Sequence, residues 1–417
     1  MTAEIIAVGS ELLTPARMDT NSLFLTLKLN ELGIDVVRKT IIGDDRVRLA
    51  DEIRQARGSS RIVIMTGGIG PTLDDVSREA VSEALGLPLD YHPEITEEIE
   101  KRISSLGRHK MAEINKRQAF VLRGAEVLPN ANGTAPGQWF EDDRGILMLL
   151  PGPPREIEPL FETQCLPRLR KLESPQQFYT ASLRVAGLPE SEVDQRIGPI
   201  YSAESRVATT ILASPGEIQV HMRAQAATKE EAREIALALS KRVEAELGSS
   251  VFTRENEPLE AVLLRICRER KITMAVAESC TGGMIAEHIT AIPGASESFR
   301  GAVVSYTDEA KRKLLHVSRK TLEEYGAVSR ETAAEMAQGV RTVFEASLGV
   351  ATTGIAGPAG GSEKTPLGTV FVAVADDDGV DVDELHIGGD RERVRVWATR
   401  RALNMMRRRL EGRDHPL

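Results

Sequence analysis

The sequence is poor in cysteine and in aromatic residues, and it has no long apolar run. Its three cysteines, Cys165, Cys267 and Cys280, show no CxxC spacing, which excludes a cysteine-rich zinc site and a disulfide framework. The longest apolar run, residues 146–150, is far too short to cross a bilayer. The N-terminus also lacks the basic and apolar regions of a secretory signal. We therefore expect a cytoplasmic protein with no membrane partner.

A surplus of positive charge is absent as well. The net charge of −9 argues against a general nucleic-acid binder, because affinity for a phosphate backbone depends on surplus Lys and Arg. Residues 391–413 are a local exception, rich in arginine. We expect most of these arginines to form a solvated helix face, with four apolar residues turned inward: Val394, Trp397, Leu403 and Leu410.

Strand and helix patterns alternate over the first 170 residues. The pattern predicts strands at residues 4–8, 35–42, 61–66 and 146–150, and helices at 20–32, 44–57 and 74–85. Repeated βα units of this kind favour a parallel sheet covered on both faces, with ligands at the carboxyl ends of its strands.

The rest of the chain divides into two further parts, since 417 residues exceed what one core usually supports. Residues 173–256 indicate a small α+β module, which begins near Leu172-Glu173-Ser174-Pro175. Residues 257–417 alternate strand and helix again. The predicted fold class is therefore α/β: two α/β domains with mainly parallel sheets, 1–172 and 257–417, joined by the small module.

Reactive residues gather where a predicted strand at 273–277 meets a helix at 284–290. Ser279 would stand at the end of the strand, and the N–H groups of Cys280, Thr281 and Gly282 could stabilise an oxyanion there. The glycines Gly282 and Gly283 allow a ligand to approach the backbone closely. The same pattern is also typical of a simple helix cap. A catalytic serine would need a base, and no histidine of this region lies in a glycine-rich loop.

Several ordered motifs over residues 258–410 resemble the C-terminal domain of the CinA family. They are Ala277-Glu278-Ser279-Cys280-Thr281-Gly282-Gly283, Gly301-Ala302-Val303-Val304-Ser305-Tyr306 with Ala310-Lys311, Thr353-Gly354-Ile355-Ala356-Gly357-Pro358, Gly368-Thr369-Val370 and Gly389-Asp390-Arg391. The resemblance implies hydrolysis of nicotinamide mononucleotide (NMN) to nicotinic acid mononucleotide and ammonia, without a cofactor.

The resemblance also implies roles for single residues. Ser279 is the nucleophile and Lys311 the general base, with Tyr306 beside them. Such a lysine must be neutral, which requires burial or nearby positive charge; the carboxylate of Asp308 could perturb it. Cys280 is the competing nucleophile, although strand alternation should turn it away from Ser279. The remaining expected substrate contacts are Cys280, Thr281, Gly282, Gly283, Thr353, Gly354, Gly357 and Arg391, and Arg391 is a candidate for binding the phosphate.

A glycine-rich loop follows the predicted strand at 61–66. Gly67, Gly68 and Gly70, together with Thr72, are typical of a phosphate cradle. Asp74 and Asp75 follow directly, in the first turn of the predicted helix. Paired carboxylates beside a phosphate favour a hard cation, but they also suit the dipole of a helix N-terminus.

Motifs over residues 3–170 resemble the N-terminal domain of the same family, which is similar to molybdopterin-binding proteins of the MogA/MoeA type. They are Gly9-Ser10-Glu11-Leu12-Leu13, Asp19-Thr20-Asn21, Gly67-Gly68-Ile69-Gly70-Pro71-Thr72-Leu73-Asp74-Asp75, Asn115-Lys116-Arg117-Gln118, Gly133-Thr134-Ala135-Pro136-Gly137 and Leu150-Pro151-Gly152-Pro153-Pro154. The resemblance implies an ADP-ribose pyrophosphatase that yields AMP and ribose 5-phosphate. The metal, Mg²⁺ or Co²⁺ with or without a monovalent cation, would lie near Glu11, Asp19, Asp74 and Asp75, and Asn21 would contact the substrate.

Three alternatives stay open. The middle module resembles a KH-like fold but contains no GxxG loop, so a spacer or a dimerisation element fits better than a nucleic-acid binder. The family's name (competence/damage-inducible) allows a non-enzymatic competence or DNA-repair factor. The N-terminal domain could also bind a pterin without hydrolysing anything. The leading hypothesis is a bifunctional enzyme that acts on NMN and ADP-ribose as a homodimer.

Overall fold

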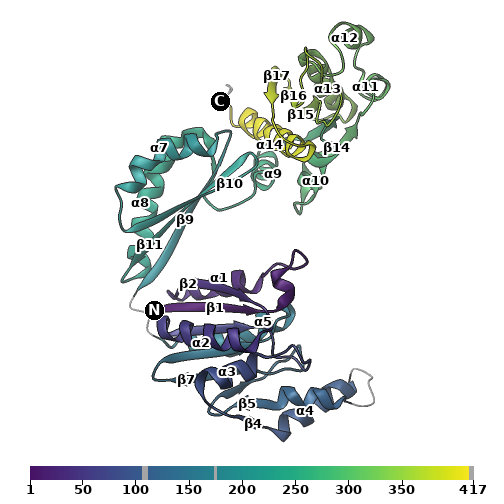
Figure 1. Ribbon diagram of the computed structural model, residues 1–417. Helices are drawn as coiled ribbons and strands as arrows, with labels where there is room; N and C mark the ends of the chain where they lie inside the picture. The colour runs from purple at the N-terminus through teal and green to yellow at the C-terminus, as the bar shows by residue number, and fades with distance from the viewer. Residues whose placement is uncertain (106–110, 173–175, 413–417) are drawn as a thin grey trace. The chain divides into compact units, whose positions relative to one another are not determined.

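The structure is a computed structural model that describes residues 1–105, 111–172 and 176–412. The chain divides into two compact units, Met1–Phe178 with Gln225–Ala232 and Tyr179–Ala224 with Arg233–Leu417 (Figure 1). Residues 173–175, where the first predicted boundary falls, lie outside the described residues. The domain boundaries stay predictions, because compactness alone does not separate the small module from the rest of the second unit.

The first unit is built on a six-stranded sheet in the order β2-β1-β3-β8-β7-β6. The four strands from β2 to β8 are parallel, whereas β7 runs antiparallel to both β8 and β6. The bounds are β1 Thr2–Val8, β2 Asp35–Ile42, β3 Ile62–Thr66, β6 Glu126–Leu128, β7 Gly137–Asp142 and β8 Gly145–Leu150. Alternation explains the apolar runs: Ile5 packs into one core with Leu25, and Ile6 into another with Leu49.

Helices cover both faces of this sheet. They are α1 Asn21–Glu31, α2 Arg46–Ser59, α3 Ser77–Leu85 and α5 Pro154–Leu160, while α4 Pro93–Ser105 lies with the small ribbon of β4 Leu89–Tyr91 and β5 Phe120–Leu122 (Figure 1). The prediction that Asp74 and Asp75 lie in the first turn of a helix is wrong. Helix α3 begins only at Ser77, because residues 70–76 form a turn that closes on itself through the Asp75 carboxylate.

Most of the small α+β module belongs to the second unit. Its four-stranded sheet has the order β10-β11-β9-β12, with β9 Gln177–Ala186, β10 Val207–Ser214, β11 Glu217–Ala226 and β12 Val251–Thr253. The helices α7 Glu190–Ser202 and α8 Lys229–Leu247 complete it. The predicted α+β character of this module is confirmed. In β9 and β11, buried residues alternate with less buried ones, since these strands cover only one core.

The remainder is a five-stranded sheet in the order β14-β13-β15-β16-β17. Strand β13 is parallel to β14 and β15, and β16 is antiparallel to β15 and β17. The strands are β13 Met274–Glu278, β14 Phe299–Val304, β15 Leu348–Gly354, β16 Thr369–Asp376 and β17 Gly379–His386; the helices are α9 Leu259–Arg270, α10 Met284–Thr290, α11 Asp308–Leu315, α12 Arg319–Glu324, α13 Arg330–Val343 and α14 Arg391–Leu410. The predicted α/β class is confirmed, and both large sheets add an antiparallel side to a parallel centre.

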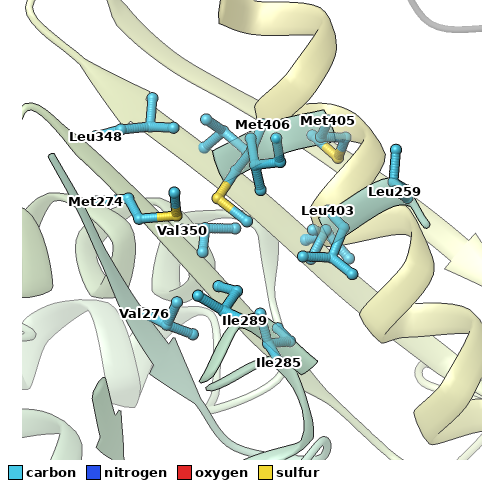
Figure 2. Packing of buried hydrophobic residues seen from close by; sticks show 14 of the residues in the cluster. Leu259, Met274, Val276, Ile285, Ile289, Leu348, Val350, Leu403, Met405 and Met406 are labelled. Atoms are coloured by element: carbon cyan, nitrogen blue, oxygen red, sulfur yellow. The ribbon is translucent and has the colours of Figure 1, made fainter. Parts of the chain in front are cut away.

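Figure 2 shows the larger core of this domain, in which β13 and β15 face three helices. Met274 and Val276 of β13 point toward the same space as Leu403 of α14 and Ile285 of α10. The opposite face of the sheet packs on α11 and α13. The two cores hold β13 in place, and they thereby also fix the position of Ser279, which directly follows this strand.

Helix α14 does not present its arginines as a solvated face, so this prediction is wrong for much of the helix. Four of them pair with carboxylates: Arg400 with Glu260, Arg401 with Asp383, Arg407 with Glu411, and Arg409 with Asp376 and Asp381. For three of these arginines the reason is tertiary, because β16, β17 and α9 bring acidic side chains against the helix; Glu411, the partner of Arg407, directly follows the helix itself. Across the described residues, no helix has both the length and the apolar character needed to cross a membrane.

Candidate active site

Ser279 lies immediately after β13, at the edge formed by the carboxyl ends of the parallel strands. Its backbone N–H donates to the Thr352 carbonyl of β15 at 3.0 Å, so the neighbouring strand holds it. The residue is 8% exposed and lines a cavity of about 250 Å³. The side chain is therefore neither a solvent-exposed helix cap nor sealed inside the core.

Lys311 meets Ser279 across this edge. It lies in the first turn of α11 and is only 2% exposed. Its Nζ is 3.2 Å from the Ser279 Oγ and donates to the Ser305 carbonyl at 3.0 Å. Burial lowers the pKa of Lys311, and the opposing effects of Asp308 and Cys280 do not cancel this. The structure thus brings together a hydroxyl and an amine that burial shifts toward its neutral form.

The turn after Ser279 uses some of the donors that we expected to face a ligand. The N–H of Gly282 donates to the Ser279 carbonyl at 3.2 Å. The fully buried Glu278 carboxylate accepts from the N–H groups of Gly283, Ile285 and Ala286 at 2.8, 3.2 and 2.9 Å. The Glu278 carboxylate therefore satisfies the N-terminus of α10 from within the protein, and the Gly282 N–H, which we expected to face an oxyanion, is bound to Ser279 instead.

Glu278 is a residue that the sequence reasoning passed over. Its only signal was its place directly before the serine, at the end of an apolar strand where a buried carboxylate needs partners. Thr281, Gly282 and Gly283 were expected to contact substrate, but they do not line the cavity. Thr281 is fully buried, and its hydroxyl lies 2.8 Å from the Thr352 hydroxyl.

Cys280 lines the cavity but is a poor nucleophile. Burial raises the pKa of its thiol to about 12, so the reactive thiolate is scarce at neutral pH. The side chain belongs to the apolar core beneath the site. Of the two competing nucleophiles, the geometry favours Ser279.

Another part of the cavity wall comes from the end of β15 and the loop after it. Thr353, Gly354 and Gly357 line the cavity as expected, and the Thr353 hydroxyl donates to the Ala327 carbonyl at 2.6 Å. Since that hydroxyl is occupied within the protein, Thr353 shapes the wall.

Tyr306 and Arg391 form the mouth of the cavity. Tyr306 is 60% exposed, and its hydroxyl accepts from Arg391 Nη2 at 2.8 Å. Arg391 Nη1 donates to the Gly357 carbonyl at 2.7 Å. Tyr306 thus lines the same cavity as Ser279 and Lys311, but its hydroxyl is bound to an arginine at the rim.

The first unit contains a larger cavity of about 450 Å³ at the carboxyl ends of β1 and β3. Gly67, Gly68 and Gly70 line it, as does Asn21, whose amide donates to the Thr66 hydroxyl at 2.9 Å and the Gly152 carbonyl at 2.7 Å. Gly67 has a φ of +96°, and a Cβ there would lie 2.3 Å from the Val8 carbonyl oxygen. Only glycine allows the loop to pass this close to β1.

The predicted metal ligands line this cavity without converging. Asp19 accepts from the Ser22 N–H at 3.0 Å, and Asp75 accepts from both the N–H and the hydroxyl of Thr72 at 2.8 and 2.5 Å. Thr72 itself does not line the cavity. Within the part of the chain that the structure describes, no three His, Cys, Asp or Glu residues are placed to hold a metal. Glu11, Asp19, Asp74 and Asp75 therefore form no metal centre on their own.

Two arginines hold the glycine-rich loop from behind. Arg78, only 2% exposed, donates to the carbonyls of Ile69 and Gly70, the latter at 2.7 Å. Arg117 donates to the carbonyls of Thr72 and Asp75. Because these carbonyls point toward the arginines, the loop keeps one conformation. Burial lowers the pKa of Arg78 to about 10, which leaves it charged at neutral pH. The sequence reasoning missed Arg78, whose signal was a cation on the helix just after the loop.

The fold and the two cavities define a multidomain α/β protein with a serine–lysine pair in its last domain. Three family profiles match: a probable molybdopterin binding domain over residues 4–171, a damage-inducible protein CinA KH domain over 180–253, and a CinA C-terminal domain over 256–410. The chain belongs to the CinA family, which confirms the resemblance.

Relatives match along the whole chain. A CinA-like protein of Solibacter usitatus is 48% identical over 413 residues and 99% of both chains. Another, from Koribacter versatilis, is 46% identical and covers 98% of this chain and 100% of that one. Among solved structures, the competence/damage inducible protein CihA from Agrobacterium tumefaciens is 39% identical and covers 37% of this chain and 93% of that one, with a TM-score of 0.36.

Proposed function

We propose that the C-terminal domain hydrolyses the amide of NMN to nicotinic acid mononucleotide and ammonia. The observation that supports this most is the 3.2 Å contact between the Ser279 Oγ and the buried Lys311 Nζ. A serine hydroxyl attacks an amide only when a base removes its proton, and a buried lysine is one of the few such bases.

The reaction has two halves. Neutral Lys311 accepts the Ser279 proton as the Oγ attacks the carboxamide carbon, and the N–H group of Cys280, which lines the cavity, faces the oxyanion that forms. Lys311 returns the proton to the leaving nitrogen, so that ammonia departs and an ester to Ser279 remains. Water then attacks this ester with Lys311 again as base, which releases the carboxylic acid and restores the serine.

The mouth of the cavity suits the other end of the substrate. In this proposal Arg391 binds the phosphate, since its guanidinium is held at the rim by Tyr306 and by the Gly357 carbonyl. A substrate with the amide at Ser279 and the phosphate at Arg391 would span the cavity from its floor to its rim.

An ammonia assay with NMN on wild type, Lys311→Met and Cys280→Ala tests this proposal. Lys311→Met should lower the rate by about a hundredfold or more, because the general base is lost. Cys280→Ala should keep most of the activity, because its thiol stays protonated. Ammonia release that depends on Cys280 and not on Ser279 or Lys311 would refute the mechanism.

For the N-terminal domain we propose cleavage of ADP-ribose to AMP and ribose 5-phosphate. The supporting observation is the charge of the cavity, whose lining has one arginine, Arg17, against six carboxylates: Glu11, Asp19, Asp44, Asp74, Asp75 and Glu156. A diphosphate would be repelled there unless a divalent cation, Mg²⁺ or Co²⁺, entered with it. Formation of AMP from ADP-ribose with added metal separates this activity from pterin binding alone.

Both activities would use small nucleotides of the cytoplasm. The three cysteines are unpaired, which suits a reducing compartment. A homodimer is part of the proposal, and light scattering of the full chain tests it.

A further inference from the structure

Helix α14 reaches the turn that carries Ser279 as well as the mouth of the cavity. Arg395 lies one helical turn after Arg391 and is partly buried. Its Nε and Nη2 both donate to the Thr281 carbonyl oxygen, at 3.2 and 2.9 Å. Two donors from one planar guanidinium fix the direction of a carbonyl more firmly than a single donor does.

This contact fixes one particular peptide of the turn. The Thr281 carbonyl shares its peptide plane with the Gly282 N–H, which donates to the Ser279 carbonyl at 3.2 Å. The peptide is thus held at both ends. Arg395 holds its carbonyl, with a longer contact from the Met284 N–H at 3.4 Å, and Ser279 holds its N–H. Gly282, with a φ of +63°, needs such support because it has no side chain to limit its rotation. The N–H of Gly283 is held separately, by the Glu278 carboxylate.

We infer that Arg395 is a positioning residue for the serine turn. It keeps the peptide between Thr281 and Gly282 turned so that its carbonyl faces away from the cavity, and it thereby holds the turn with the Cys280 N–H group toward the developing oxyanion. The effect on turnover rests on the proposed amide hydrolysis, whereas the anchoring of the turn does not. Arg395 does not line the cavity, so it acts through the turn rather than on substrate.

Steady-state kinetics on NMN test the inference with Arg395→Ala, Arg395→Lys and the control Arg393→Ala. Arg393 is exposed on the same helix, with its guanidinium 5.9 Å from the Trp397 ring centroid. Arg395→Ala should lower kcat about tenfold to a hundredfold, near the effect of losing an oxyanion donor. KM should change little, and the pH at which kcat rises should stay, because Arg395 does not contact Lys311. The kcat of Arg395→Lys should lie between the values of wild type and Arg395→Ala.

Hydrogen exchange of the peptide covering residues 279–286 supplies a readout that does not require activity. Exchange should be faster in Arg395→Ala than in wild type or Arg393→Ala. If wild type releases no ammonia from NMN, the substrate proposal fails and exchange alone decides whether Arg395 anchors the turn. Unchanged exchange, wild-type kcat, or a loss seen only in KM overturns the inference. Should Arg395→Ala not fold, Arg395→Lys provides the same comparison.

Discussion

Burial has different consequences for the cations of the two cavities: it makes Lys311 a base beside Ser279, whereas Arg78 stays charged and anchors a loop. In the C-terminal cavity, Lys311 is buried beside Ser279, and burial lowers the pKa of its amine. In the N-terminal cavity, Arg78 is equally buried behind the glycine-rich loop, and burial lowers the pKa of its guanidinium to about 10. Burial is the cause in both cases, but the ordinary pKa is 10.5 for a lysine and 12.5 for an arginine.

This difference explains why the two cations are not interchangeable. An amine whose pKa falls toward neutrality can accept a proton, so it suits catalysis. A guanidinium stays charged and offers several donors in one plane, so it suits the holding of carbonyls, as Arg78 and Arg395 do. Each of the following changes tests whether the two cavities depend on these separate principles.

The largest effect should follow Ser279→Ala. Ammonia release from NMN should fall by about a thousandfold or more, because the nucleophile is lost. Cleavage of ADP-ribose should stay at the wild-type rate, since the two cavities lie in different units. Assays of ammonia and of AMP on the same preparation measure both, and a joint loss would contradict the independence of the cavities.

Removal of divalent metal should abolish the N-terminal activity and leave the C-terminal activity intact, the reverse of Ser279→Ala. EDTA should stop AMP formation from ADP-ribose, because the acidic lining would then repel the diphosphate. Ammonia release from NMN should continue, since its proposed mechanism uses only Ser279 and Lys311. Restoring Mg²⁺ or Co²⁺ is the control, and amide hydrolysis that stops with EDTA would count against the mechanism.

Arg78→Met should lower only the proposed activity of the N-terminal cavity. It leaves the carbonyls of Ile69 and Gly70 without their donors, and each unpaired buried group costs about 1–3 kcal/mol. AMP formation should fall about tenfold or more as the loop loses its position. Arg61→Met, an exposed arginine of the same unit, is the matched control. Full ADP-ribose cleavage by Arg78→Met would show that the loop needs no anchor.

The smallest effect should be a shift of the pH profile by Asp308→Asn. The active form of Lys311 is the neutral amine, so kcat should rise as pH rises through its pKa. Asp308 raises that pKa, and its removal should therefore move the rising limb to lower pH. Measurement of kcat at a series of pH values from pH 6 upward shows in which direction the rising limb moves. A shift to higher pH would show that another group is the base.

Much of the scaffold could be predicted, because its signals are local. The helix at 284–290 and the strand at 35–42 have the predicted ends, since a periodic apolar pattern is interrupted at each end. The true start of the next helix, at Ser77 and not at Asp74 as expected, could not be predicted. A carboxylate near a helix start suits the helix dipole and a closed turn equally well, and only the contact of Asp75 with Thr72 distinguishes them.

The sequence alone determined the α/β class, the family and the strand ends at which Ser279 and the glycine-rich loop lie, because chain periodicity and motif order are properties of neighbouring residues. The tertiary structure decided which partners each side chain meets. It placed Lys311 at Ser279, Tyr306 at Arg391, Arg78 behind its loop and Arg395 on Thr281. These pairs are far apart in sequence or on different elements, and their energies depend on burial, which no local pattern specifies.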